Sequence, residues 1–154
     1  LHPRTAKEGF RGRARWERIR DLVRMVGDEA RVFGSGDVKS LADVKAFFAC
    51  TGAHGVLIGR AALSRPWIFR ECKTGEEREL SLAQRVALLR QLERYLLSYR
   101  PPKDCLRVLK TFAPKFFKGA SGRRKFTPAL LKAPDLASFW EILEALAGDD
   151  RLEK

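Results

Sequence analysis

The sequence is poor in the residues that build disulfide frameworks and zinc sites. Cysteine occurs only as Cys50, Cys72 and Cys105, and histidine only as His2 and His54. Three scattered cysteines without a CxxC pair exclude a disulfide framework, and with two separated histidines they are too few for a zinc site. We therefore expect no metal, and the free cysteines favour a reducing, cytoplasmic setting.

Long apolar runs and a balance of charge are also missing. No apolar stretch approaches the ~20 residues that span a bilayer, so we expect no membrane partner. Thirty-one Lys and Arg residues against 19 Asp and Glu give a net charge of +12. This excess favours an acidic polymer, RNA or DNA, as partner. The chain begins at Leu1 without a signal-peptide pattern, and we expect it to be a segment of a longer protein.

Helix and strand patterns alternate over residues 1–72, which is typical of a parallel α/β sheet or barrel. Apolar residues at three- and four-residue spacing mark the helices, and Ser40 with Asp43 predicts a capping box. The expected elements are a helix over 15–26, a strand over 30–33, a turn over 34–37, a helix over 41–50, a strand over 55–58 and a helix start after Gly59.

The second half carries helix patterns only. A charged stretch over 73–80 predicts a linker, residues 81–147 a helical bundle, and residues 148–154 a flexible tail. Ser81 and Gln84 predict a capping box at the first helix of this bundle. Pro101-Pro102 predicts the end of that helix, and Pro114 a kink or a new helix start. A basic loop is expected over 119–125, and Asp135 is expected to cap the last helix.

Positive charge gathers in residues 100–132, where ten Lys and Arg residues face one acid, Asp104. Phosphate contacts by such cations give salt-dependent, largely sequence-independent affinity for nucleic acid. A solvated helix face is the alternative interpretation. The aromatic residues of this region are predicted to form bundle core rather than a stacking surface: Phe112, Phe116, Phe117 and Phe126.

The junction after the strand over 55–58 predicts a phosphate site. A glycine turn at Gly59 leads into a helix start, where backbone N–H groups and the helix dipole favour an anion. Arg60 adds a cation with a planar fork of donors. In β/α barrels phosphate commonly binds after the last two strands. The alternative for Arg60 is a surface arginine that caps a carbonyl, and Trp67 and Phe69 are expected to pack as core.

Several segments in register resemble the tRNA-dihydrouridine synthase family over nearly the whole chain. The family patterns are HxRT, G(Y/F)xGxxxW, GNGD, DGVMIGRAALGNPW and RKH followed by WYxKG. The matching segments are HPRT at 2–5, GFRGRARW at 9–16, GSGD at 34–37, GVLIGRAALSRPW at 55–67, RVLK at 107–110 and KFFKG at 115–119.

The resemblance implies the C-terminal portion of an FMN enzyme, with the last strands of a (β/α)8 TIM barrel followed by a helical tRNA-binding domain. Such an enzyme reduces uridine in tRNA to 5,6-dihydrouridine with NADPH as reductant. The family's general-acid cysteine would lie upstream of Leu1, so no catalytic residue is expected in this chain and the fragment alone is expected to be inactive.

The resemblance also assigns binding residues. Those implied for the cofactor are His2, Gly34, Ser35, Gly36, Asp37, Gly59 and Arg60, and those for tRNA are Arg4, Arg107, Lys110, Lys115 and Lys118. Serine at position 35 replaces the family's usual asparagine, and its hydroxyl is shorter and offers one hydrogen-bond donor instead of two. For His2 the alternative is an ordinary loop residue, for Arg4 a structural ion pair, and for residues 34–37 a plain turn.

Two other functions remain open from the sequence. A different FMN-dependent TIM-barrel oxidoreductase would explain the phosphate site but not the basic helical region. A non-catalytic RNA-binding module would explain the charge but would treat the α/β part as scaffold. Flavin bound to the full-length protein would exclude the module.

Overall fold

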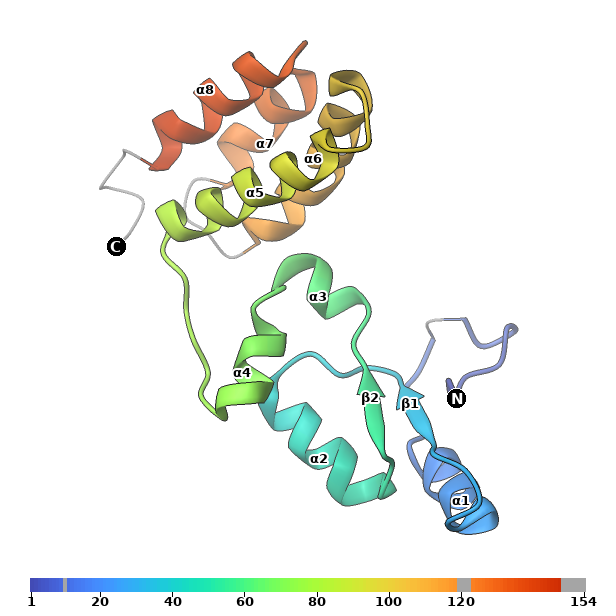
Figure 1. Ribbon diagram of the computed structural model, residues 1–154. Coiled ribbons are helices and arrows are strands. Elements are labelled where there is room, and N and C mark those ends of the chain that lie inside the picture. The colour runs from blue at the N-terminus through green and yellow to red at the C-terminus, as the bar shows by residue number, and fades with distance from the viewer. Residues whose placement is uncertain (10, 119–122, 148–154) are drawn as a thin grey trace. The chain divides into compact units, whose positions relative to one another are not determined.

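The computed structural model describes residues 1–9, 11–118 and 123–147. Its internal contacts divide the chain into two compact units, Leu1–Arg78 and Glu79–Lys154 (Figure 1). Each unit has a hydrophobic core of its own.

The first unit is a short parallel sheet with helices. Strands β1 (Phe33–Ser35) and β2 (Gly55–Leu57) pair in parallel, with Gly34 opposite Val56, and Figure 1 shows the two arrows pointing the same way. Parallel neighbours need a crossover, and α2 supplies it. The helices of this unit are α1 (Glu17–Val26), α2 (Leu41–Thr51), α3 (Arg60–Ser64) and α4 (Ile68–Thr74).

Leu1 extends the sheet at the other edge of β1. Its amino group donates to the Phe33 carbonyl oxygen at 2.6 Å, and the Ser35 N–H donates to the Leu1 carbonyl oxygen at 3.0 Å. This pair of hydrogen bonds flanks Gly34 as in a parallel ladder. Three chain segments therefore run side by side and leave the sheet at the same end.

The helices α1 and α2 cover one face of the sheet. Ile19 and Phe47 are fully buried there, and a Cβ at Gly34 would lie 2.8 Å from a side-chain carbon of each. Glycine at this position thus lets both helices approach the strand. Phe33 and Leu57 point to the opposite face and are 50% and 59% exposed.

The second unit is a four-helix bundle with no strand in its described residues. Its core contains Leu89, Leu109, Leu130, Phe139 and Leu143, each fully buried. Figure 1 shows the helices of this unit packed together, and they are α5 (Leu82–Leu97), α6 (Pro102–Phe116), α7 (Arg123–Lys132) and α8 (Leu136–Ala147).

Most helix starts agree with the sequence. The predicted capping boxes of Ser40 with Asp43 and of Ser81 with Gln84 are both present. The Asp135 carboxylate accepts from the Ser138 N–H at 2.8 Å at the start of α8. These three predictions are confirmed because a cap is a local motif of three or four residues.

The first strand and the third bundle helix differ from expectation. β1 begins at Phe33 instead of Ala30 and includes Gly34 and Ser35, which were predicted as turn. Val32 directly precedes β1, and its N–H donates to His54 Nδ1 at 3.1 Å. Within the predicted loop over 119–125, a helix begins at Arg123, while residues 119–122 lie outside the described part.

Three further expectations change. Helix α6 continues through Pro114 to Phe116, so the proline lies in its last turn and starts no new helix. Helix α4 extends to Thr74, into the predicted linker. Phe69, expected in a core, is 55% exposed, whereas Phe116, Phe117 and Phe126 are buried as predicted.

The predicted tail, residues 148–154, lies outside the described residues. Across the described part of the chain, none of the helices has the length and apolar character that a membrane crossing requires.

Candidate functional site

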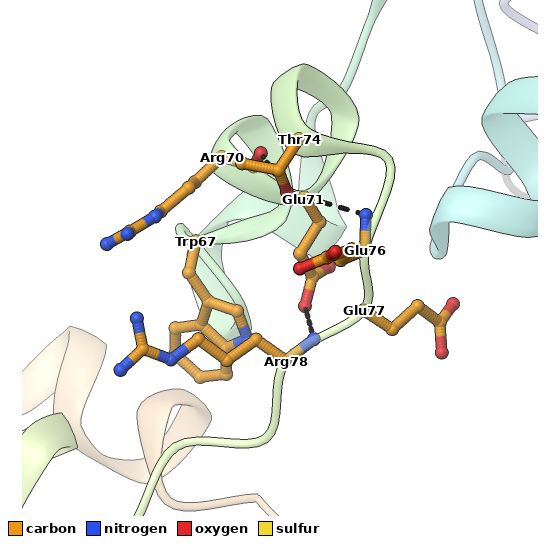
Figure 2. A pocket seen from close by; sticks show the side chains of 7 residues that line it. All are labelled: Trp67, Arg70, Glu71, Thr74, Glu76, Glu77 and Arg78. Atoms are coloured by element: carbon orange, nitrogen blue, oxygen red, sulfur yellow. Dashed lines mark hydrogen bonds between the residues drawn. The ribbon is translucent and has the colours of Figure 1, made fainter.

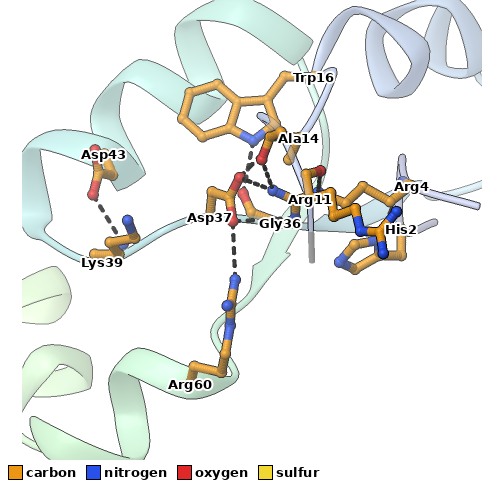
Figure 3. A network of polar contacts seen from close by, with 11 residues as sticks. His2, Arg4, Arg11, Ala14, Trp16, Gly36, Asp37, Lys39, Asp43 and Arg60 are labelled. Carbon is orange, nitrogen blue, oxygen red and sulfur yellow. Dashed lines mark hydrogen bonds and ion pairs between the residues drawn. The ribbon is translucent and has the colours of Figure 1, made fainter. Parts of the chain in front are cut away.

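The predicted cofactor residues meet where the parallel segments leave the sheet. His2 follows Leu1, Asp37 follows β1, and Arg60 follows β2. Because the segments are parallel, their carboxyl ends share one edge, which is where ligands bind in α/β proteins. Figure 3 shows Asp37 between Arg4 on one side and Arg60 on the other.

The Asp37 carboxylate connects all three segment ends. Its Oδ1 accepts from Arg4 Nη1 at 3.1 Å and from Arg60 Nη2 at 3.0 Å. Its Oδ2 accepts from Arg4 Nη2 and from the Ala14 N–H, the latter at 2.9 Å. One carboxylate shared by two arginines leaves a net positive charge at this edge.

These contacts lower the pKa of Asp37 below its ordinary value of 3.8. The hydrogen bonds from Arg4 are the largest cause, the Ala14 N–H and the charges of Arg4 and Arg60 add to it, and partial burial opposes it. Hydrogen bonds and cations both favour the charged form of a carboxyl group. Asp37 is therefore ionised throughout the physiological range.

Arg4 is held as a structural cation. Its side chain is only 4% exposed, and its Nη2 and Nε donate to the carbonyl oxygens of Gly12 and Arg11 at 2.7 and 3.3 Å. With Asp37 these contacts occupy both ends of the guanidinium. Of the two roles weighed for Arg4, the structure supports the ion pair.

The backbone at 36 and 37 has left-handed conformations. Gly36 has φ of 124°, and Asp37 has φ of 56°, the only positive φ at a non-glycine position among the described residues. A Cβ at Gly36 would lie 2.8 Å from the Ala14 Cβ. The indole N–H of Trp16 donates to the Gly36 carbonyl oxygen at 2.8 Å, which anchors the turn to α1. Packing and hydrogen bonding therefore hold Asp37 in this strained conformation.

Gly59, another of the three predicted site glycines, lies in open space. No atom lies within 4 Å of a Cβ built there. Ser35, the last residue of β1, is half-buried. Gly59 and Ser35 thus remain beside the shared edge, whereas Gly34 is committed to helix packing.

Arg60 reaches across the edge of an open pocket of about 440 Å³. Its side chain is 58% exposed although it contacts Asp37. The pocket is lined by more cations than acids, and its residues are Arg4, Gly12, Arg13, Trp16, Asp37, Lys39, Asp43 and Arg60. This excess of positive charge suits an anionic group.

His2 is exposed beside this pocket. Its Nδ1 accepts from the Arg4 N–H at 3.2 Å. A neutral imidazole that accepts at Nδ1 carries its proton on Nε2. The ring therefore offers an Nε2 donor.

Apart from Arg4, the residues predicted to bind tRNA lie in the second unit. Arg107, Lys110 and Lys115 lie on α6, and Lys118 follows its end. At 100° per residue the three cations on the helix, Arg107, Lys110 and Lys115, span an arc of about 140°, and Lys118 follows the helix end. The core residues of α6, such as Leu109, Ala113 and Phe116, occupy the other side. The four cations thus form one face, named here the α6 basic face.

A second pocket of about 300 Å³ lies around Glu71 in the first unit (Figure 2). Glu71 is 1% exposed. Its Oε1 accepts from Arg65 Nη2 and from the Arg78 N–H, both at 2.8 Å. These bonds tie the α3–α4 region to the segment that follows α4. The carboxylate thus has a structural role.

Sequence reasoning missed Arg13 and Lys39 as pocket residues, and it also missed the ion pairs of Asp37. Trp16 belongs to a quoted motif but was not assigned a role. No local motif predicts the Asp37 ion pairs, because residues 4, 37 and 60 lie far apart in the sequence and meet only in the folded chain. Among the described residues no group of three or more His, Cys, Asp or Glu side chains could hold a metal ion.

Comparison with known proteins identifies the family. The family model for dihydrouridine synthase (Dus) matches residues 1–144. A probable tRNA-dihydrouridine synthase of Aquifex aeolicus is 34% identical over 144 residues, which cover 94% of this chain and 45% of that protein. A probable tRNA-dihydrouridine synthase of Treponema pallidum is 29% identical over 150 residues, covering 93% and 44% respectively.

A third relative has a more specific name. The tRNA-dihydrouridine(47) synthase [NAD(P)(+)] of Coprinopsis cinerea is 36% identical over 107 residues, which cover 64% of this chain and 16% of that protein. The chain spans less than half the length of the curated relatives it matches. With the family match extending over both units, the chain belongs to the dihydrouridine synthase family.

Proposed function

We propose that the protein containing this chain is an FMN-dependent tRNA-dihydrouridine synthase that reduces uridine in tRNA with NADPH in the cytoplasm. In this proposal residues 1–72 supply the last strands of a (β/α)8 barrel and residues 81–147 a tRNA-binding domain. The observation that carries it is the meeting of three parallel segment ends at one open, cationic pocket.

The pocket fits the phosphate end of FMN. Arg60 is exposed and already directed across the pocket, and Gly59 leaves room for close approach. Asp37 neutralises only one of the two arginines it contacts. We therefore assign Gly59 and Arg60 to phosphate binding, with Gly36 and Ser35 beside them, and Asp37 to holding Arg60 in place.

His2 is assigned to the flavin ring. Its Nε2 donor suits an acceptor atom, and an imidazole donor stabilises negative charge that develops on a reduced ring system. The flavin, when bound, supplies the hydride that reduces the uracil ring.

A proton donor for the uracil ring is not expected from this chain. Cys50, Cys72 and Cys105 lie on helices α2, α4 and α6, and none lies at the strand ends. Burial is the main cause that raises the pKa of the Cys72 and Cys105 thiols. A raised pKa and burial are typical of structural cysteines. The catalytic acid is therefore proposed to lie in the part of the protein outside this chain.

The α6 basic face is assigned to the tRNA backbone. Arg107 is 75% exposed and pairs with Asp104 at 3.2 Å, and exposed ion pairs of this kind are weak, so a phosphate can replace the carboxylate. Lys115 and Lys118 are also exposed. This face would hold the tRNA body while the target base leaves its stack to reach the flavin.

The test is a direct assay of the full-length protein. Purified protein is incubated with an unmodified tRNA transcript, FMN and NADPH, and dihydrouridine is measured by mass spectrometry of the digested RNA. We expect dihydrouridine to form only when all three are present. Failure to bind FMN and to form dihydrouridine, in a folded protein, would contradict the proposal. RNA binding without flavin binding would favour a non-catalytic RNA-binding module.

A further inference from the structure

The two tyrosines of the sequence lie together on the surface of the second unit. Tyr95 and Tyr99 are 63% and 67% exposed. Their i, i+4 spacing places them on one side of a helix. The helical turn continues past the end of α5, because the N–H groups of Tyr99 and Arg100 both donate to the Leu96 carbonyl oxygen, at 3.2 and 2.9 Å.

The backbone that carries these rings is well fixed. Leu96 is 4% exposed and packs into the bundle core. The Ser98 hydroxyl donates to the Tyr95 carbonyl oxygen at 2.7 Å. Pro101 then takes an extended conformation and is the N-cap residue of α6. The backbone thus holds both tyrosines in place, and their exposed rings contribute little to the core.

Exposed cations lie close in sequence to the two tyrosines, and one of them contacts a ring. Arg94, Arg100 and Lys103 are exposed, and the Arg100 guanidinium carbon lies 5.4 Å from the centre of the Tyr99 ring. Asp104 is the one acid between residues 94 and 107, and its carboxylate pairs with Arg107 at 3.2 Å. Lys103 and Arg107 lie on α6, so exposed cations continue along the chain from the tyrosines to the α6 basic face.

We propose that Tyr95 and Tyr99 form a stacking platform for unpaired bases of RNA, flanked by cations that bind the adjoining phosphates. Aromatic rings with neighbouring Arg and Lys side chains are the chemistry by which proteins hold unstacked nucleotides. The charge around the rings favours RNA over a basic or neutral protein surface. This inference rests on the proposed tRNA function and adds base contacts to the phosphate contacts already assigned.

The experiment measures tRNA affinity of the full-length protein across a salt series. The variants are Tyr95→Ala with Tyr99→Ala, the ring-preserving Tyr95→Phe with Tyr99→Phe, and Leu131→Ala as a control at another half-exposed apolar side chain of the same unit. We expect the double alanine variant to bind about 10-fold or more weakly, because stacking contributes strongly to each base contact. The phenylalanine and Leu131 variants should bind as the unchanged protein does.

The salt dependence separates stacking from charge. Stacking releases no phosphate counterions, so the slope of log affinity against log salt should stay unchanged in the alanine variant. An unaltered affinity in that variant, or an equal loss with phenylalanine, would overturn the platform. A loss that is as large for an RNA duplex as for single-stranded oligouridylate would also overturn it.

Failure of the platform can be told from failure of the proposed function. If the unchanged protein binds no tRNA, the proposed function is wrong. If it binds tRNA and the alanine variant binds equally well, only the platform is wrong. A Tyr95 and Tyr99 surface that instead binds a protein or a lipid vesicle, with tRNA affinity unchanged, also counts against the platform.

Discussion

The carboxylate of Asp37 joins three chain segments that lie far apart in the sequence. It contacts Arg4, the Ala14 N–H and Arg60, from 33, 23 and 23 residues away. The sequence predicted that Asp37 and Arg60 belong to one cofactor site, whereas Arg4 was assigned to tRNA. It did not predict their mutual ion pairs, because pairing depends on rotamers that only the folded backbone decides.

The ion pairs of Asp37 predict a pH-dependent loss of stability in Asp37→Asn. Because the pKa of Asp37 is lowered in the folded state, its contribution to stability is present above its ordinary pKa of 3.8 and is lost as pH falls through the lower folded value. Asparagine tolerates positive φ but leaves Arg4 without a counter-ion. We expect the free energy of unfolding at neutral pH to fall by roughly 1–3 kcal/mol.

Urea unfolding of both proteins across a pH series measures this difference. The difference should be constant between about pH 5 and 8 and should shrink below about pH 4. A difference that grows on acidification would contradict the assignment. Asp28→Asn, at an exposed position, is the matched control and should change little at any pH.

Alanine substitutions at two glycines of this site should have unequal effects on stability. Gly36→Ala places a side chain at φ of 124° and 2.8 Å from the Ala14 Cβ, which should lower the free energy of unfolding by roughly 2–4 kcal/mol. Gly59→Ala meets open space and should change stability by less than about 1 kcal/mol. Chemical denaturation decides, and equal effects of the two variants would show that the turn at Gly36 is not packed as described.

Among the helices and strands, the sequence predicted the elements marked by short local motifs and missed those whose pattern is interrupted. Both capping boxes and the Asp135 cap come from short motifs, and they are confirmed. Helix α7 was missed because Pro128 and a run of cations interrupt its pattern. Its apolar signal was nevertheless present, since Phe126, Leu130 and Ala133 are buried at four- and three-residue spacing. Strand β1 is displaced because Gly34 packs as a strand residue against two helices.

The cap of α5 gives a test at this scale. In Ser81→Ala the Gln84 N–H loses its acceptor, and we expect a loss of about 1 kcal/mol in the free energy of unfolding. Ser98→Ala at the other end of α5 removes a hydroxyl that donates to a carbonyl oxygen instead and should cost less. Thermal or urea unfolding compares the two variants, and a larger effect at Ser98 would contradict the capping assignment.

The α6 basic face gives a second test. Replacing Lys110, Lys115 and Lys118 by glutamine should weaken tRNA binding regardless of sequence and lower the salt slope by up to about 3, roughly one for each phosphate contact. Glutamine at the exposed Lys7, Lys45 and Lys73 in the first unit removes the same charge outside the pocket. If that control lowers the slope as much, the effect belongs to net charge and not to this face.

For the whole molecule, the family resemblance predicted more about function than the helix and strand patterns did. Alternating elements indicated an α/β region, but a two-stranded sheet is common to many folds. The family was recognisable because several short segments match in register across both units, and the family match to residues 1–144 confirms it. Arg13 stands at a variable position of its motif, and Lys39, Tyr95 and Tyr99 belong to none of the matched segments, so these residues were found only from exposure and position.

Gly59 and Arg60 are proposed to hold the phosphate of FMN at the shared strand edge. The most direct measurement compares the dissociation constants of FMN and riboflavin, by flavin fluorescence, in the unchanged full-length protein and in Arg60→Ala. Riboflavin lacks the phosphate, so the account predicts a loss of about 10-fold or more for FMN and almost none for riboflavin. Equal changes for the two flavins, or an unchanged affinity for FMN, would contradict it.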